Sequence, residues 1–218
     1  LAGDKGFGID ESMLEYIDEQ KKNDREENVE NGIIIRGGNF WLGRQALNME
    51  KSAADHMGML ATVMNSIALQ DALEAHGIPT RVQTALTITR VAEPYILRKA
   101  LHHFEKGRIV IFACGTGNPF FSTDTGAALR AAEINAEVLL LAKNVDGIYD
   151  SDPKTNPNAK KFDELSYLDV IQKGLHAMDT TAISLCMENK IPIIAFALKE
   201  KDSIVRVVNG ERIGTIIH

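Results

Sequence analysis

The stretch from Gly115 to Thr125 reads GTGNPFFSTDT, and its glycines, hydroxyls and carboxylate are the residue types of this chain best suited to bind a ligand. It follows an apolar run, 108–113, that predicts a buried strand, and it precedes a small-residue segment, 126–133, that predicts a helix. At such a junction, free backbone N–H groups and the positive end of the helix dipole attract anions. The hydroxyls add donors, and Asp124 adds a carboxylate where a cation-bound phosphate could sit. The stretch therefore predicts an anion site, and the alternative is a polar turn that binds nothing.

Two other predicted strands also end in polar loops that contain glycine. The apolar run 32–35 leads into Gly37 and Gly38, and the apolar run 136–142 leads into the loop 143–152. Ligands of an open parallel sheet lie beyond the carboxyl ends of its strands, so we expect all three loops to converge on one cleft. The loops lack a P-loop pattern, a dinucleotide-binding glycine turn and a Ser-His-Asp arrangement.

The elements that must position these loops alternate in the order that is typical of βαβ units. Helices are expected over 11–22, 53–75, 93–106, 126–133, 167–173 and 180–188. Strands are expected over 32–35, 80–88, 108–113, 136–142, 191–198 and 214–217. This pattern predicts one α/β domain over residues 1–218. The apolar side chains of the long helix, Met57, Met59, Leu60 and Met64, are expected to pack in the core or at a subunit interface.

Composition and charge exclude several classes of function. A net charge of −6 argues against non-specific nucleic-acid binding. The chain contains no apolar run long enough to span a bilayer, so no membrane partner is expected. Cys114 and Cys186 lie in apolar surroundings and are expected to be buried free thiols of a cytoplasmic protein. The histidines are scattered, with His102 and His103 expected on a helix surface, and no metal site made of protein ligands alone is predicted.

Five segments of the chain together resemble the bacterial uridylate kinase family, which has the amino-acid-kinase fold. They are Gly37-Gly38-Asn39, DHMGMLAT from Asp55 to Thr62, the string from Gly115 to Asp124, VDGIY from Val145 to Tyr149, and Met178-Asp179. The resemblance implies a three-layer α/β/α sandwich around a mostly parallel sheet. It also implies transfer of the γ-phosphoryl group of ATP to UMP with Mg²⁺, in pyrimidine nucleotide biosynthesis. Family members are homohexamers, and GTP and UTP are candidate effectors.

The same resemblance implies roles for individual residues. Those implied to hold UMP are Gly37, Asp55, Thr116, Gly117, Asn118, Pro119, Phe120, Phe121, Ser122 and Thr123, with Asp55 accepting hydrogen bonds from the ribose hydroxyls. Those implied to hold ATP are Gly38, Lys143, Tyr149 and Asp152, with Tyr149 against the adenine. A loop linked to GTP activation corresponds to Gly3, Asp4, Lys5, Gly6, Phe7 and Gly8. Asp124 is implied to lie near the transferring phosphoryl group, where it could orient a basic residue or the metal.

This sequence departs from the family pattern in three places. The family's opening strand and its Lys-x-Ser-Gly loop precede the point at which this sequence starts, so we expect a segment upstream of Leu1. Leu42 stands where the family has an arginine, and Arg44 is the candidate catalytic cation that could substitute for it. Arg36 stands where the family usually has glycine.

Two other hypotheses therefore remain beside a UMP kinase. One is a kinase of the same fold that acts on a carboxylate or a carbamate, such as an aspartate or glutamate kinase. The other is a catalytically impaired regulator that binds UMP or UTP without turnover.

Overall fold

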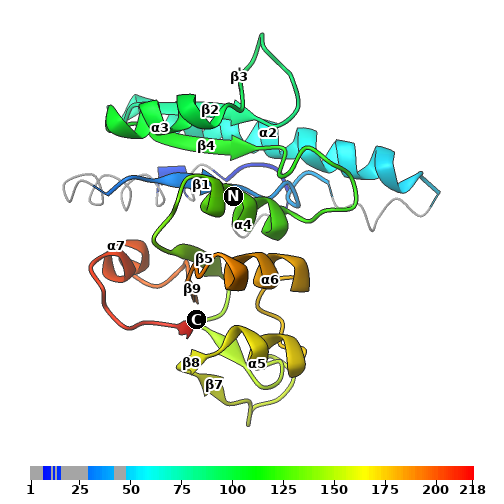
Figure 1. The fold of residues 1–218 in the computed structure, drawn as a ribbon, viewed down its shortest axis with the longest axis vertical. Helices are drawn as coiled ribbons and strands as arrows, with labels where there is room; N and C mark the ends of the chain where they lie inside the picture. Colours follow the sequence, from blue (N-terminus) through cyan, green and yellow to red (C-terminus); the bar gives the residue numbers. More distant parts are fainter. Residues whose placement is uncertain (1–6, 11, 13, 16–28, 42–47) are drawn as a thin grey trace. The chain divides into compact units, whose positions relative to one another are not determined.

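The computed structural model describes residues 7–10, 12, 14–15, 29–41 and 48–218. The chain divides into two compact units, residues 1–126 and residues 127–218. Each unit has its own four-stranded sheet, and most of the elements are labelled along the ribbon in Figure 1.

The sheet of the first unit is entirely parallel. Its strand order is β1 (Gly32–Ile34), β4 (Ile109–Ala113), β2 (Thr80–Thr84) and β3 (Glu93–Pro94). The register pairs the first residues of β2 and β4 with each other. The three predicted strands of this unit are confirmed, although β2 ends four residues before the predicted boundary. Since every strand runs the same way, all their carboxyl ends meet at one edge of the sheet.

Helices cover both faces of strand β4, which explains why all five of its residues are apolar and buried. Alternate side chains, including Ile109 and Ile111, belong to a core cluster with Leu69 and Leu73 of α2 (Lys51–Ala75). On the other face, the ring of Phe112 packs edge-on against Phe104 of α3 (Leu97–Glu105), with centroids 6.5 Å apart. The helix predicted over 53–75 is confirmed and begins two residues earlier.

Helix α3 begins four residues later than predicted, because Glu93 and Pro94 extend the sheet instead. These two residues form β3 and pair with Gln83 and Thr84 of β2. Proline lacks the N–H that a helix interior requires and biases the preceding residue toward extended backbone. An edge strand accepts that geometry, so the prediction of helix at 93–96 is wrong.

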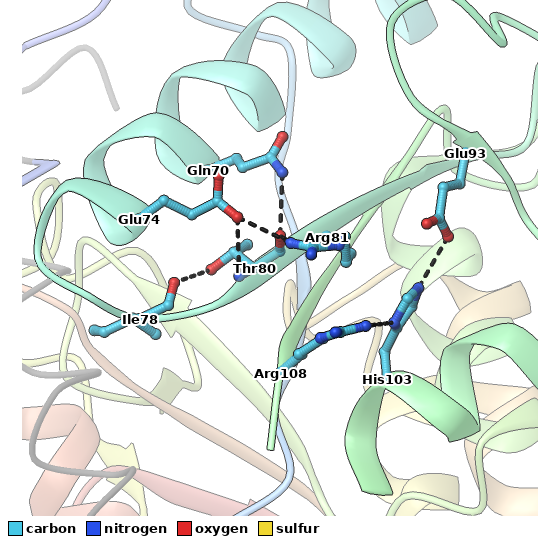
Figure 2. Close-up of polar contacts among 8 residues, drawn as sticks. All are labelled: Gln70, Glu74, Ile78, Thr80, Arg81, Glu93, His103 and Arg108. Carbon is cyan, nitrogen blue, oxygen red and sulfur yellow. Dashed lines mark hydrogen bonds and ion pairs between the residues drawn. The ribbon is translucent and has the colours of Figure 1, made fainter. Parts of the chain in front are cut away.

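Hydrogen bonds join α2 to the start of β2, as the left half of Figure 2 shows. The amide of Gln70 donates to the carbonyl of Thr80 at 3.1 Å, and the Glu74 carboxylate accepts from the N–H of Thr80 at 3.4 Å. Glu74 also pairs with Arg81 at 3.0 Å. These contacts tie the end of the helix to the strand that follows it.

His103 is buried, so the expectation that it lies on a helix surface is wrong. Its ring bridges Glu93, at 2.9 Å from Nε2, and Arg108, at 3.1 Å from Nδ1 (Figure 2). A guanidinium can only donate, so Nδ1 accepts and Nε2 carries the hydrogen given to Glu93. Burial raises the pKa of Glu93, but hydrogen bonds from His103 and Gln83 outweigh it and lower the pKa below its ordinary value.

The sheet of the second unit is mixed. Its order is β5 (Leu139–Lys143), β9 (Ile193–Ala197), β10 (Thr215–Ile217) and β8 (Glu164–Leu165). Strand β10 runs antiparallel to β9 and parallel to β8, whereas β5 and β9 are parallel. The strands predicted near 136–142, 191–198 and 214–217 are confirmed.

A short antiparallel pair, β6 (Ile148–Tyr149) and β7 (Lys161–Phe162), was not predicted from the sequence. It closes the loop that follows β5. This closure requires glycine at position 147. Any other residue would place its Cβ 2.7 Å from the Thr215 hydroxyl oxygen, which is too close.

Three helices complete the second unit: α5 (Tyr167–Gln172), α6 (Thr180–Glu188) and α7 (Ser203–Val208). Side chains cap the first two of them. Ser166 and Asp169 form a reciprocal capping box at α5, and Asp179 accepts from the N–H of Ala182 at the start of α6. The prediction of α5 and α6 is confirmed, and α7 was not predicted.

Both cysteines are free and buried, as predicted. Burial raises the pKa of the Cys186 thiol to about 11 and also raises the pKa of Cys114. No helix in the described part of the chain is long and apolar enough to cross a membrane.

Candidate active site

The turn that follows β1 is pressed against helix α2. The N–H groups of Phe40 and Trp41 both donate to the carbonyl of Gly37 at 3.0 Å, which closes the turn. A Cβ on Gly37 would lie 2.7 Å from the carbonyl oxygen of Gly58 and 2.8 Å from the Cβ of Ala61. Contacts this short are not tolerated, so only glycine allows the turn to lie where it does.

Two asparagines hold the same turn in place. Asn65 is fully buried on α2, and its amide donates to the carbonyl of Arg36 at 2.7 Å. Asn39 and Asn65 exchange amide hydrogen bonds at 2.9 and 2.5 Å. Asn39 also donates to the carbonyl of Gly8 at 2.7 Å, and the Gly8 N–H donates to the carbonyl of Asn39 at 3.0 Å. The backbone around Arg36 is therefore held by Asn65 on helix α2 and by Asn39 within the turn.

Loop 115–122 follows β4 and bends sharply. The backbone is left-handed at Cys114, Gly115, Gly117 and Phe120, with φ of 68°, 54°, 78° and 72°. For the two residues that are not glycine, this geometry costs about 1–2 kcal/mol each. Gly126 packs directly beneath the loop, since a Cβ there would lie 2.7 Å from the Cα of Gly115. Strain of this kind persists only where neighbouring groups hold it.

Asp55 is one of the groups that hold the strained loop. Its Oδ2 accepts from the backbone N–H of Phe120 at 2.8 Å, while Lys51 donates to both carboxylate oxygens at 2.7 and 2.6 Å. Burial raises the pKa of Asp55, but hydrogen bonds from Lys51 and Phe120 outweigh it and lower the pKa below its ordinary value. Asp55 is therefore ionised at neutral pH and can accept further hydrogen bonds.

Helix α4 (Thr123–Glu133) starts where loop 115–122 ends, three residues before the predicted boundary. The hydroxyl of Ser122 accepts from the N–H of Thr125 at 3.0 Å, as a helix-capping residue does. Asp124 lies in the first turn of α4, where its Oδ1 is 3.2 Å from Nη2 of Arg36. This ion pair joins the loop after β4 to the turn after β1.

In the second unit, Lys143 is the last residue of strand β5, and its ammonium donates hydrogen bonds to backbone carbonyls. Its Nζ donates to the carbonyls of His176 and Ala177 at 2.9 and 2.8 Å. These bonds hold the segment that leads into the Asp179 cap of α6.

The loop after β5 carries two further predicted residues, Tyr149 and Asp152. The hydroxyl of Tyr149 donates to Oδ1 of Asp146 at 2.6 Å, and this bond lowers the pKa of Asp146 and raises that of Tyr149. Asp152 accepts from the N–H of Lys154 at 2.9 Å and so shapes the turn that follows.

Comparison with known proteins identifies the family. The model of the amino acid kinase family matches residues 5–196. The structure of a UMP kinase from Bacillus anthracis is 36% identical with a TM-score of 0.94, and the match covers 98% of this chain and 89% of that chain. The chain belongs to the amino acid kinase family. A Ureaplasma parvum UMP kinase is also 36% identical, with a TM-score of 0.90 and coverage of 96% and 90%. A uridylate kinase from Archaeoglobus fulgidus is 25% identical, with a TM-score of 0.75 and coverage of 97% and 94%.

These matches confirm the predicted α/β class and the amino-acid-kinase fold. In this member of the family, the first unit brings Gly37, Asp55 and loop 115–122 to the carboxyl edge of one parallel sheet. The loop after β5 belongs to the second unit, so its convergence with the other two remains a prediction.

Some residues predicted from the family resemblance lie outside the described part of the chain. They are Gly3, Asp4, Lys5, Gly6 and Arg44, together with the departure at Leu42. Phe7 and Gly8 are described, and the ring of Phe7 packs edge-on against Phe40 with centroids 5.8 Å apart.

Lys51 and Asn65 were given no role from the sequence, and Thr62 was named only as the end of the DHMGMLAT segment, although each of the three supports the site. The hydroxyl of Thr62 accepts from the N–H of Cys114 at 2.8 Å and so supports the first left-handed residue before the loop. For Lys51 a signal was present, because it precedes Asp55 by four residues, the spacing of an ion pair on a helix. Asn65 and Thr62 contact residues distant in sequence, and no local pattern marks such contacts.

Proposed function

We propose that this protein transfers the γ-phosphoryl group of ATP to UMP, giving UDP and ADP. The observation that carries the proposal is the position of the Asp55 carboxylate, whose Oδ2 accepts from the N–H of Phe120 at 2.8 Å in the strained loop 115–122. An ionised carboxylate accepts hydrogen bonds from paired hydroxyls, the groups that a ribose presents. The UMP kinases among the matched structures support the choice of acceptor.

The proposed binding residues follow the two sides of the reaction. UMP would be held by Gly37, Asp55 and the segment 116–123, and ATP by Gly38, Lys143, Tyr149 and Asp152. We propose further that residues 1–218 work as one catalytic domain, which the family match over residues 5–196 supports.

Magnesium is proposed to arrive with ATP. In the described part of the chain, no group of three or more His, Cys, Asp or Glu side chains is placed to hold a metal ion. Magnesium is commonly held by one or two carboxylates together with substrate phosphates, so this arrangement fits a nucleotide-borne ion. Asp124 is the carboxylate at the site that could contribute one ligand, and the ion would neutralise charge on the phosphates.

Assembly into a homohexamer is proposed to use helix α2. Met57, Leu60, Met64 and Ile67 are 38–51% exposed and recur at spacings of three and four residues, which places them on one face of the helix. Large exposed apolar residues gathered on one face are typical of a contact surface. We propose further that the segment 3–8, whose residues Phe7 and Gly8 contact the turn after β1, is linked to activation by GTP.

We place the reaction in the cytoplasm, in pyrimidine nucleotide biosynthesis. Two free, buried cysteines are compatible with a reducing compartment.

A panel of phosphoryl acceptors tests the proposed function. The purified protein is incubated with ATP and Mg²⁺ plus UMP, aspartate, glutamate or carbamate, and the products are separated by chromatography. We expect UDP and ADP in equal amounts with UMP, and no phosphorylated product from the other acceptors. A phosphorylated carboxylate or carbamate would support a different member of the fold, and UMP binding without UDP would support a regulator.

A further inference from the structure

Arg36 projects from a rigid position at the edge of the site. Its carbonyl is held by buried Asn65 at 2.7 Å, and the next residue, Gly37, is pressed against α2. The side chain nevertheless remains 69% exposed. A fixed backbone with a solvent-facing guanidinium is suited to meeting a ligand that arrives from solution.

One nitrogen of the Arg36 guanidinium is aimed by Asp124, at 3.2 Å. Asp124 directly follows Thr123, the last residue of the proposed UMP segment, and its side chain is only 16% exposed. An ion pair with an exposed partner contributes only about 0–1 kcal/mol to folding stability. Stabilisation of the fold therefore gives little reason for Arg36 to lie beside Asp124. The guanidinium has five N–H donors in a planar fork, and those not used by Asp124 match the oxygens of a phosphate.

Lys51 is another described cation beside loop 115–122, and its ammonium already binds other groups. Its ammonium lies within 2.7 Å of both carboxylate oxygens of Asp55 and 5.5 Å from the centroid of the Phe120 ring. Moving it to a phosphate would break the contact that holds Asp55. Arg36 has no comparable task in the described structure, and its remaining donors can meet a phosphate while the ion pair with Asp124 stays in place.

We infer that Arg36 binds the phosphate of the acceptor nucleotide, with Asp124 as the residue that aims its guanidinium. The inference rests on the proposed function, because it assumes a nucleoside monophosphate in loop 115–122. The family resemblance does not supply this assignment, since the family usually has glycine at the position. Arg36 thus provides a positive charge from the turn after β1, next to the group that accepts the phosphoryl transfer.

Calorimetric binding of UMP and of uridine tests this inference, because the two ligands differ only in the phosphate. Wild type, Arg36→Gln and Arg36→Lys are compared. We expect Arg36→Gln to weaken UMP binding by about tenfold or more while uridine binding stays unchanged. Arg36→Lys keeps the positive charge but lacks the planar set of N–H donors, so its UMP affinity should lie between those of wild type and Arg36→Gln. The matched control is Arg206→Gln, which removes another arginine ion pair, with Glu211 in the second unit, and should behave as wild type.

Unchanged UMP affinity in Arg36→Gln overturns the inference, as does an equal loss for UMP and uridine, which would indicate a structural role. Thermal unfolding of each variant checks that the fold is intact. UDP formation by the wild type is measured separately. A wild type that binds UMP but makes no UDP contradicts the proposed function, while the UMP-to-uridine comparison still decides the role of Arg36.

Discussion

Replacing Gly37 with alanine is expected to lower the turnover of UMP by about 10²-fold or more. The new Cβ would lie 2.7 Å from a backbone carbonyl of α2 and 2.8 Å from a second Cβ, so the turn after β1 must move away from the helix. That movement displaces both Gly38 and Arg36, which flank the substituted residue. Displacements of about 1 Å at a reacting centre commonly reduce rates by this factor. Steady-state kinetics with UMP and ATP measures the effect.

Gly58→Ala is the matched control for this substitution. Gly58 lies on α2 opposite the turn, and a Cβ there would meet nothing closer than 3.9 Å. Alanine in a helix interior is favoured over glycine by about 0.5–1 kcal/mol, so this variant should be as active as wild type and slightly more stable. Wild-type turnover in Gly37→Ala would mean that the turn does not position the reacting groups.

Asp55→Ala is expected to weaken UMP binding by about 1.5–3 kcal/mol, the usual value of a hydrogen bond to a charged group. The substitution removes the proposed acceptor for the ribose hydroxyls. It also frees the Phe120 N–H, whose bond helps to hold the left-handed backbone of loop 115–122. ATP affinity should stay nearly constant, because the proposed ATP contacts lie on other loops. Equilibrium titration with each nucleotide measures the difference.

Asp71→Ala provides the comparison, since Asp71 is an exposed carboxylate on the same helix. It should bind both nucleotides as wild type does. If Asp55→Ala weakens ATP and UMP equally, then Asp55 acts on the fold rather than on the acceptor.

Long helices and continuous apolar strands were predictable from the sequence, whereas two-residue strands were not. Helix α2 is a run of 25 residues rich in the helix formers Met, Leu and Ala and is followed by Gly77, and α6 is bounded by the Asp179 cap. Strand β4 is a continuous apolar run because helices cover both its faces. By contrast, β3, β6, β7 and β8 have two residues each, too few to show a period. Their place depends on partner strands that are distant in the chain.

The candidate site was also predictable only in part, because its loops are local in sequence and the contacts that hold them are not. The glycines and hydroxyls of loop 115–122 stand together in the sequence, and so does the Gly37-Gly38 pair. The contacts that hold them join distant residues: Asp55 with Phe120, Asn65 with Arg36, and Arg36 with Asp124. Arg36 is the clearest example. In the sequence it is only a departure from the family pattern, whereas in the structure its position beside Asp124 suggests that it binds a phosphate.

The ratio of kcat/KM for UMP to that for CMP tests most directly the claim that loop 115–122 recognises a uridine nucleotide. The two substrates share ribose and phosphate, so contacts with Asp55 and Arg36 are the same for both, and only the edge of the base differs. A site whose backbone and hydroxyl groups pair with uracil leaves polar groups unpaired when cytosine enters, which costs about tenfold for each 1.4 kcal/mol lost. We therefore predict that UMP is preferred by at least about tenfold. Equal kcat/KM values for UMP and CMP would contradict the claim.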